Sequence, residues 1–100
     1  NPNTFFVFLT NNDSYGYNKK LNTNGLIAQK AMYSLAERHN GAVWDMFEVM
    51  GGLKSANIWN ARGLLKNDRI HFTTQGYNLI GDLLFNALME AYDNYLIGQN

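Results

Sequence analysis

The sequence predicts an α/β fold with parallel strands, on three observations. Residues 4–10 and 42–47 are short apolar runs of β-branched and aromatic residues without polar alternation, as in strands that are covered on both faces. Residues 26–40, between them, repeat apolar side chains at helical spacing and so complete a strand–helix–strand unit. A second apolar helical pattern follows residue 73 and would cover the sheet.

The first predicted strand leads into a polar connection. Residues 11–14 are Asn-Asn-Asp-Ser, whose side chains favour turns, and residues 15–24 are rich in Asn, which predicts a loop. The helix over residues 26–40 is expected to end at Asn40-Gly41, because both residues tolerate the left-handed backbone of a helix stop. Residues 42–47 are then predicted to form the second strand.

The second half contains two more predicted helices. Residues 48–54 include a Gly-Gly pair and are expected to form a turn or loop. Ser55 is the predicted N-cap of a short helix over residues 56–61, which Gly63 would stop. Thr73 is the predicted N-cap of the last helix. Apolar residues three and four apart predict that this helix buries a wide face against the sheet: Tyr77, Ile80, Leu83, Leu84, Ala87, Leu88 and Ala91.

The predicted elements do not make a complete layered domain. Two parallel strands of this kind need cover on both faces and neighbours on both edges. We therefore expect residues 1–100 to be the C-terminal portion of a single larger domain, whose N-terminal part lies outside this chain. A swapped or complementing second chain would also supply the missing strands. The start at Asn1-Pro2-Asn3, without methionine, favours an internal fragment or a processed product.

Composition excludes several classes of partner. Eight basic and eight acidic residues cancel, so nothing favours nucleic acid or an anionic membrane surface. The lysines at 19, 20 and 30 are too sparse for a phosphate-binding patch. Cysteine is absent, which excludes disulfides and thiolate zinc sites. No apolar run approaches the roughly 18 residues that a membrane span requires.

Titratable chemistry and a rigid support coincide at Asp68 and His71, just before the last helix. His71 is the candidate general base, because a loop at a strand end lets its imidazole project into a site. Asp68 would accept the Nδ1 proton and stabilise the imidazolium. The structural alternative is that Asp68 only caps a turn and His71 is a partly buried loop residue.

The stretch Asp68-x-x-His71-Phe72-Thr73-x-x-Gly76-Tyr77, followed by an amphipathic helix, resembles the last sequence block of the SGNH (GDSL-type) hydrolases. Two upstream stretches also look like this family, especially its secreted carbohydrate or peptidoglycan esterases: the strand at 42–47 with Met50-Gly51-Gly52, and residues 9–15 at a strand end. The resemblance covers nearly all of the chain.

The resemblance implies the C-terminal part of a flavodoxin-like three-layer α/β/α (SGNH hydrolase) fold and a serine esterase mechanism. It implies an acyl ester as substrate, such as an acetylated carbohydrate, a secreted or periplasmic location, and a mechanism that requires no cofactor or metal. Only His71, as base, and Asp68, as its partner, carry over. The family's Gly-Asp-Ser and Gly-x-Asn-Asp blocks are not visible in this sequence. We therefore expect the chain alone to be inactive.

Other polar and aromatic residues are weaker candidates. Ser14 follows an apolar strand, as a nucleophile would, but Asn12 replaces the glycine that the sharp nucleophile turn needs. Residues 12–14 are expected to line the rim of the site. His39 is expected at a helix end and Asp45 in a structural contact with loop amides. A sugar-stacking role is open to Trp59, beside the more common role of a core anchor.

The rival interpretation is a non-catalytic α/β piece that binds a partner, in which the Asp68–His71 loop is purely structural. An upstream Gly-Asp-Ser after an apolar strand would decide for the enzyme.

Overall fold

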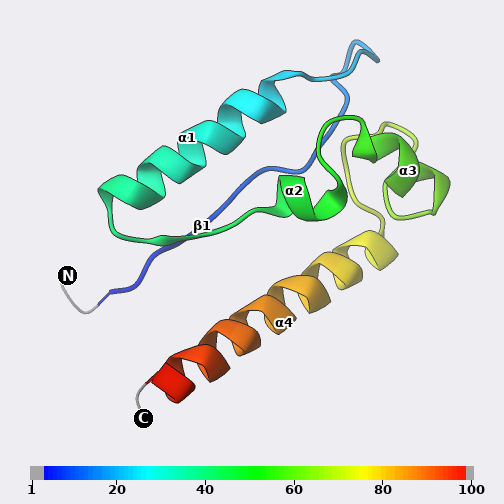
Figure 1. Cartoon of the computed structure of the whole chain (residues 1–100). Coiled ribbons are helices and arrows are strands. Elements are labelled where there is room, and N and C mark those ends of the chain that lie inside the picture. The colour runs from blue at the N-terminus through cyan, green and yellow to red at the C-terminus, as the bar shows by residue number, and fades with distance from the viewer. Residues whose placement is uncertain (1–3, 99–100) are drawn as a thin grey trace.

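The computed structural model describes residues 4–98 and has two strands and four helices in that range (Figure 1). The start of the chain, residues 1–3, lies outside the described residues. Along the chain the elements are β1 (Val7–Leu9), α1 (Asn24–Arg38), β2 (Ala42–Trp44), α2 (Met46–Met50), α3 (Ser55–Ala61) and α4 (Thr74–Gly98). Within residues 4–98, no helix combines the length and the apolar character that a membrane crossing would require.

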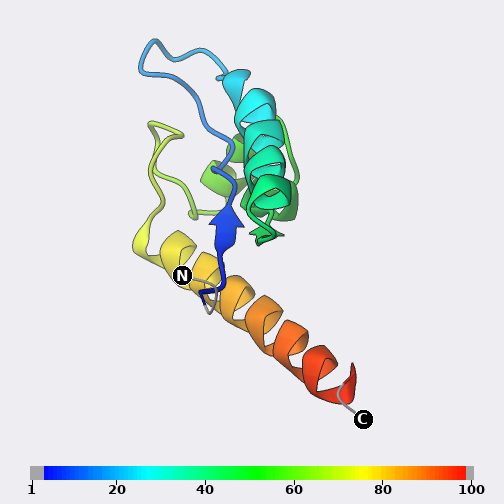
Figure 2. The same cartoon turned by 90° about the vertical axis from the view of Figure 1, so that its left-hand side faces the viewer.

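The two strands pair in parallel, which confirms the predicted strand–helix–strand unit. Val7 lies opposite Ala42 and Leu9 opposite Trp44. The ladder extends by one hydrogen bond at each end, because the Ala42 amide donates to the Phe6 carbonyl (2.9 Å) and the Thr10 amide to the Trp44 carbonyl (3.2 Å). Helix α1 contacts both strands, and α4 lies on the other side of them (Figures 1 and 2).

Helix α1 ends at the predicted stop. Asn40 adopts a left-handed backbone (φ 52°). Its amide donates to the carbonyl of Glu37 (3.4 Å), and the Gly41 amide donates to that of Ala36 (2.8 Å). These two bonds are those of a Schellman motif, which satisfies carbonyls at a helix C-terminus. His39 is the C-cap residue, as predicted for a helix end, and its ring lies 6.3 Å from that of Phe8.

Both strands are shorter than predicted. The second was expected over residues 42–47, but β2 ends at Trp44 because Asp45 caps a new helix. Its Oδ1 accepts a hydrogen bond from the Glu48 amide (3.0 Å), which satisfies a free donor of the first turn of α2. The expected loop over residues 48–54 is therefore helical up to Met50. The first strand spans Val7–Leu9 rather than residues 4–10, matching the length of its partner.

Helix α3 is capped from a distant segment. Ser55 was predicted as its N-cap, but Lys54 takes that position with a left-handed backbone (φ 75°) and no side-chain cap. Ser55 is instead the first helical residue and is buried. The Ala56 amide donates a hydrogen bond to Oδ2 of Asp13 (2.9 Å), which lies 43 positions earlier in the chain. The predicted stop at Gly63 is confirmed by its positive φ of 75°.

The main apolar cluster lies beneath the loop that joins α3 to α4. Its buried members are Met50, Ala56, Trp59, Leu65 and Phe72. Trp59 is 7% exposed, meets the Phe72 ring edge-on at 5.8 Å, and donates its indole N–H to the Met50 carbonyl (3.0 Å). A sugar-stacking role for Trp59 is therefore wrong, because its side chain is buried in this cluster.

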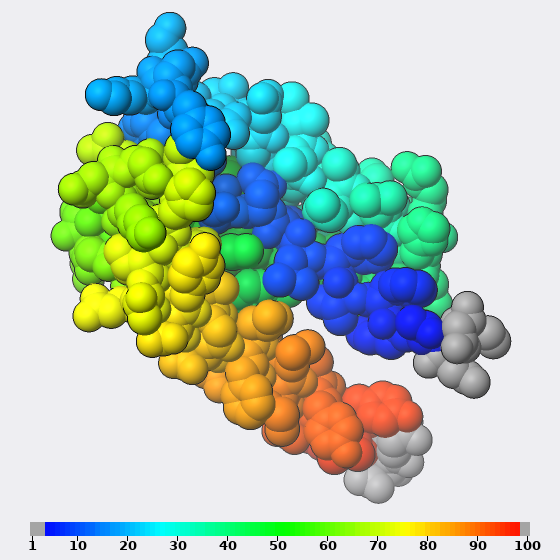
Figure 3. Space-filling model, turned by 180° about the vertical axis from the view of Figure 1, so that it is seen from behind, coloured from blue at the N-terminus to red at the C-terminus, as the bar shows by residue number. Residues whose placement is uncertain are grey.

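Helix α4 is less buried than its apolar pattern predicted. It faces the sheet, but its predicted inner residues are only half-buried or exposed, and among its described residues only Gly76 is fully buried. An apolar groove of about 160 Å³ runs between the sheet and the helix, lined among others by Val7, Trp44, Leu84 and Ala87. Figure 3 shows this opening between the blue β1 segment and the orange and red half of α4. Two strands are too narrow to cover the helix face.

Candidate active site

The loop over residues 64–73 carries both candidate catalytic side chains. It is closed by an isolated antiparallel bridge between Leu65 and Phe72 and by a hydrogen bond from the Lys66 amide to the His71 carbonyl (2.8 Å). Leu65 and Phe72 point into the core. Because successive side chains of extended backbone alternate in direction, His71 next to Phe72 points outward. The side chain of His71 is 52% exposed.

Asp68 binds both the loop backbone and the imidazole of His71. Its Oδ1 accepts hydrogen bonds from the amides of Ile70 (2.8 Å) and His71 (3.1 Å). Its Oδ2 lies 2.7 Å from Nδ1 of His71. The hydrogen bond from the imidazole, helped by the two amides, lowers the pKa of Asp68 to about 2. The carboxylate is therefore ionised at neutral pH.

This contact sets the chemistry that His71 can perform. With an ionised carboxylate at Nδ1, the proton of the neutral imidazole resides on Nδ1, and Nε2 is left as an acceptor that faces away from Asp68. That tautomer is the one a general base needs. Asp68 also caps the turn, so the structural role coexists with the catalytic one. The predicted contact is present, and the catalytic roles of both residues stay predictions.

Hydrogen bonds from two other segments hold the loop in place. The Asn12 side-chain amide donates to the Ile70 carbonyl (3.1 Å), and the Tyr15 amide donates to the Arg69 carbonyl (2.9 Å). From α3, the Asn60 side chain donates to two more carbonyls of the loop. The segment after β1 therefore lies against the Asp68–His71 loop.

Thr73 joins the loop to α4, as predicted for an N-cap residue. Its Oγ1 accepts a hydrogen bond from the Gly76 amide (3.1 Å) and donates to the Gly63 carbonyl (2.7 Å). Gly76 in turn packs against the carbonyl of Leu64, where a Cβ atom would overlap the oxygen. The sequence motif contains this glycine, but only the structure shows the close approach that requires it.

Asp45 belongs to a separate network at the ends of the strands. Its carboxylate accepts hydrogen bonds from the side chains of Thr10 (3.0 Å), Gln29 (2.8 Å) and Tyr33 (2.7 Å), besides the Glu48 amide. Burial by itself would raise the pKa of Asp45, but these hydrogen bonds together outweigh it and lower the pKa. The predicted structural role of Asp45 is confirmed, since both carboxylate oxygens are occupied.

Asp13 was expected to line the rim of the site with its neighbours, and that prediction is wrong for Asp13, because its carboxylate is buried. It is 1% exposed, and burial raises its pKa against the opposing hydrogen bonds from backbone amides, of which that of Ala56 is the strongest. Its Oδ1 has no hydrogen-bond partner among residues 4–98. The bond to α3 assigns it a structural role, because a side chain this buried does not reach a substrate.

None of the chain's three serines is paired with His71 in the described residues. The Ser14 hydroxyl makes no hydrogen bond to the imidazole, while the Ser14 carbonyl accepts one from the Asn22 amide (3.1 Å). Ser55 is buried, and Ser34 lines a different cleft with Tyr33 and Asp45. Residues 4–98 thus bring together a candidate base and its orienting acid, without a nucleophile beside them.

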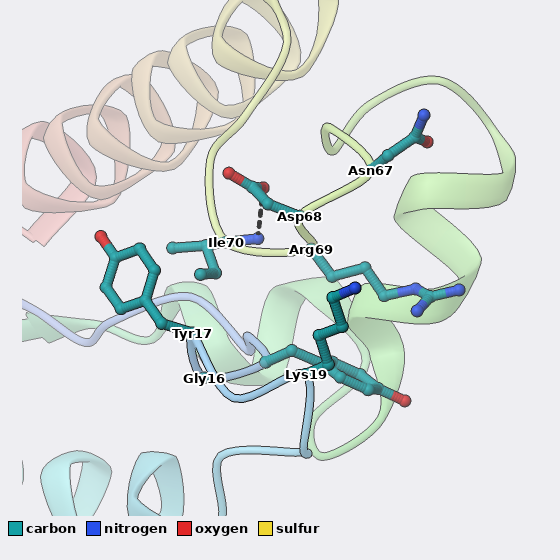
Figure 4. A pocket seen from close by; sticks show the side chains of 8 residues that line it. Gly16, Tyr17, Lys19, Asn67, Asp68, Arg69 and Ile70 are labelled. Atoms are coloured by element: carbon teal, nitrogen blue, oxygen red, sulfur yellow. Dashed lines mark hydrogen bonds between the residues drawn. The ribbon is translucent and has the colours of Figure 1, made fainter.

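A cleft of about 300 Å³ opens beside Asp68 (Figure 4). Its walls are two loops, one contributing residues between Tyr15 and Lys19 and the other residues 67–70. Sequence reasoning missed this cleft, because it is formed by segments about 50 positions apart that only the fold brings together.

Comparisons with known proteins support the fold. No protein-family description and no curated protein matches the chain. A solved structure described as "Peptidoglycan O-acetylesterase in action, 5 min" matches with a TM-score of 0.81 and 21% identity over 90% of this chain. The aligned part is 27% of that protein, so this chain spans about a quarter of its length. The predicted α/β fold with parallel strands is therefore confirmed, and it is shared with an esterase.

Proposed function

We propose that this chain is the C-terminal portion of an SGNH-type serine esterase domain that removes acetyl or other small acyl groups from carbohydrate or peptidoglycan. The observation that carries the proposal is the 2.7 Å contact between Asp68 and Nδ1 of His71, on the loop that enters α4. The fold shared with a peptidoglycan O-acetylesterase supports it. A substrate in a cell wall would place the protein outside the cytoplasm, secreted or periplasmic.

In the proposed mechanism, Nε2 of His71 takes the proton of a serine hydroxyl while the serine oxygen attacks the carbonyl carbon of the ester. Asp68 stabilises the imidazolium that forms. His71 then gives the proton to the sugar oxygen as its bond to the acyl carbon breaks, which leaves an acyl-enzyme. Water attacks that acyl group with His71 again as base, releasing the carboxylic acid and restoring the serine. No cofactor takes part in these steps.

The serine is expected on a segment outside this chain. Three features support a larger domain: the sheet has two strands, an apolar groove separates it from α4, and α4 exposes large apolar side chains. The exposed side chains include Tyr77, Phe85, Tyr92, Tyr95 and Ile97. Large apolar side chains exposed in this number on one helix are normally covered by protein. The N-terminal part of the same domain, or a complementing chain, would cover it.

The decisive experiment uses the full-length protein that contains this chain. We expect it to hydrolyse 4-nitrophenyl acetate and acetylated glycans, and His71→Ala to reduce kcat by about 10³-fold or more. His39→Ala is the matched control, because it removes an exposed imidazole at the end of α1. A fluorophosphonate should label one serine outside residues 1–100. The isolated chain should be inactive, and hydrolysis by it that His71→Ala abolishes would contradict the proposal.

The alternative is a non-catalytic module whose exposed α4 face binds a partner. The same apolar side chains favour this alternative, because they could pack against a partner protein as well as against the rest of their own domain. Two results in the full-length protein would decide for this alternative: no serine labelled by the fluorophosphonate, and equal rates for the His71→Ala variant and the parent protein.

A further inference from the structure

The cleft beside Asp68 contains two cationic side chains without acidic partners. Lys19 and Arg69 line it from the two facing loops (Figure 4). Among residues 4–98, the ion pair formed is that of Asp68 with His71, so neither cation is neutralised by a carboxylate in the described part of the chain. The chain has no net charge overall, so the excess of positive charge is a local property of this cleft.

The guanidinium of Arg69 is held in position, and no carboxylate among residues 4–98 forms an ion pair with it. Its central carbon lies 5.1 Å from the centre of the Tyr15 ring, a cation–π contact. Its Nε is buried without a hydrogen-bond partner. Because the buried Nε is out of reach of a ligand, a carboxylate would bind the two terminal nitrogens of this fixed, planar guanidinium, through two parallel hydrogen bonds and at little cost in side-chain entropy.

The backbone presents both cations from strained positions. Lys19 has φ 63° and Arg69 has φ 54°, a left-handed conformation that is uncommon outside glycine and asparagine. Local hydrogen bonds maintain it: the Lys19 amide donates to the Gly16 carbonyl and the Arg69 amide to the Lys66 carbonyl. Backbone strain of this kind concentrates at ligand-binding sites.

Asp68 is the acidic residue that lines the cleft, and its carboxylate is already engaged. It accepts hydrogen bonds from His71 and from two loop amides. In Figure 4 its carboxylate is turned away from the nitrogens of Lys19 and Arg69. An anionic ligand between those two nitrogens would therefore not compete with Asp68 for its partners.

We propose that this cleft is a subsite for a carboxylate carried by the substrate, bound by Arg69 and Lys19 close to the ester that His71 would act on. The assignment to a substrate deepens the proposed esterase function and rests on it. The cleft volume of about 300 Å³ suits one sugar unit with an acidic substituent. The expected substrate is thus an acetylated glycan that bears a carboxylate on a sugar or on a peptide attached to it.

Calorimetric binding to the full-length protein tests the subsite without turnover. The probe is the disaccharide of N-acetylglucosamine and N-acetylmuramic acid, whose lactyl group is a free carboxylate, compared with its methyl ester. We expect the free acid to bind about tenfold or more tightly. Arg69→Gln should bring the ratio of the two dissociation constants close to one, and Lys19→Gln should reduce it in part. A general loss of structure would weaken both ligands alike and leave the ratio unchanged.

Lys20→Gln is the matched control, since Lys20 has the same charge in the same loop but does not line the cleft. It should leave the ratio unchanged. A third ligand, the disaccharide with a dipeptide on the lactyl group, distinguishes a sugar carboxylate from a peptide carboxylate. The subsite would be overturned if the free acid and its methyl ester bind with equal affinity, or if neither the disaccharide acid nor its dipeptide derivative binds. Equal effects of Arg69→Gln and Lys20→Gln would overturn it too. A preference for the acid in a protein without esterase activity would overturn only the proposed function.

Discussion

Gly76 packs against the backbone carbonyl of Leu64, so closely that a methyl group in place of its α-hydrogen would overlap the oxygen. This contact brings the first turn of α4 against the start of the loop that carries Asp68 and His71. Thr73 reinforces it, because the Thr73 amide donates to the same Leu64 carbonyl (3.0 Å). The glycine thus connects the helix to the candidate site.

Gly76→Ala should therefore destabilise the protein, although alanine favours helices. We expect the overlap to cost about 1–3 kcal/mol in the free energy of unfolding, measured by denaturant titration. Gly81→Ala, in the same helix, has no atom within 4 Å of the added methyl group and should stabilise by about 0.5–1 kcal/mol. A Gly76→Ala variant that is as stable as the parent protein, or more stable, would show that Gly76 is not under this constraint.

Asp68→Asn should retain the fold and lose activity. The Asn oxygen can still accept from the loop amides, but the side chain no longer holds the imidazole in the tautomer that leaves Nε2 free. We expect kcat of the full-length esterase to fall on the order of 10³- to 10⁴-fold. Asp82→Asn, an equal charge change on the exposed surface of α4, is the control. If kcat falls less than tenfold in Asp68→Asn, the role of Asp68 is only to cap the turn.

The carboxyl group of Asp68 should titrate near pH 2, followed by the ¹³C chemical shift of its carboxyl carbon. Because the folded-state pKa of about 2 lies below the ordinary value of 3.8, the contact stabilises the folded protein above about pH 4. That contribution is lost as the pH falls toward 2. His71→Ala removes the largest cause of the shift, so the pKa of Asp68 should rise toward 3.8. An unchanged titration in this variant would assign the low pKa to the loop amides.

Asp13 offers the opposite pH dependence. Its pKa is raised by burial, so the folded state favours the protonated form and loses stability as the pH rises above the ordinary pKa of 3.8. Asp13→Asn keeps an oxygen for the Ala56 amide and cannot ionise, so it should be at least as stable as the parent at pH 7. Asp13→Ala loses the cap of α3 and should cost about 1 kcal/mol. Equal losses for the two variants in thermal unfolding would contradict this assignment.

The fold class, the helix stop at Asn40-Gly41 and the cap at Thr73 could be predicted because their causes are local. Apolar runs, helical periodicity and turn-forming residues act within a few positions of the chain. The same kind of signal was present for α2 and was overlooked: Asp45-x-x-Glu48 is a helix-capping spacing, and it ends the strand at Trp44.

What remained hidden depends on contacts between distant segments. No local pattern places Asp13 at the start of α3 or Tyr15 beneath Arg69. The apolar pattern of α4 predicted a buried face, but burial depends on what packs against it, and two strands leave much of that face open.

The Asp68–His71 pair lies between these two cases. The spacing of the two residues and the helix that follows them could both be predicted from the sequence. The 2.7 Å contact requires the loop to be closed by Leu65 and Phe72 over a common core, and by Asn12 and Asn60 from outside. Local chemistry therefore selected the residues, whereas long-range packing set their geometry, because only the folded chain holds a carboxylate against an imidazole.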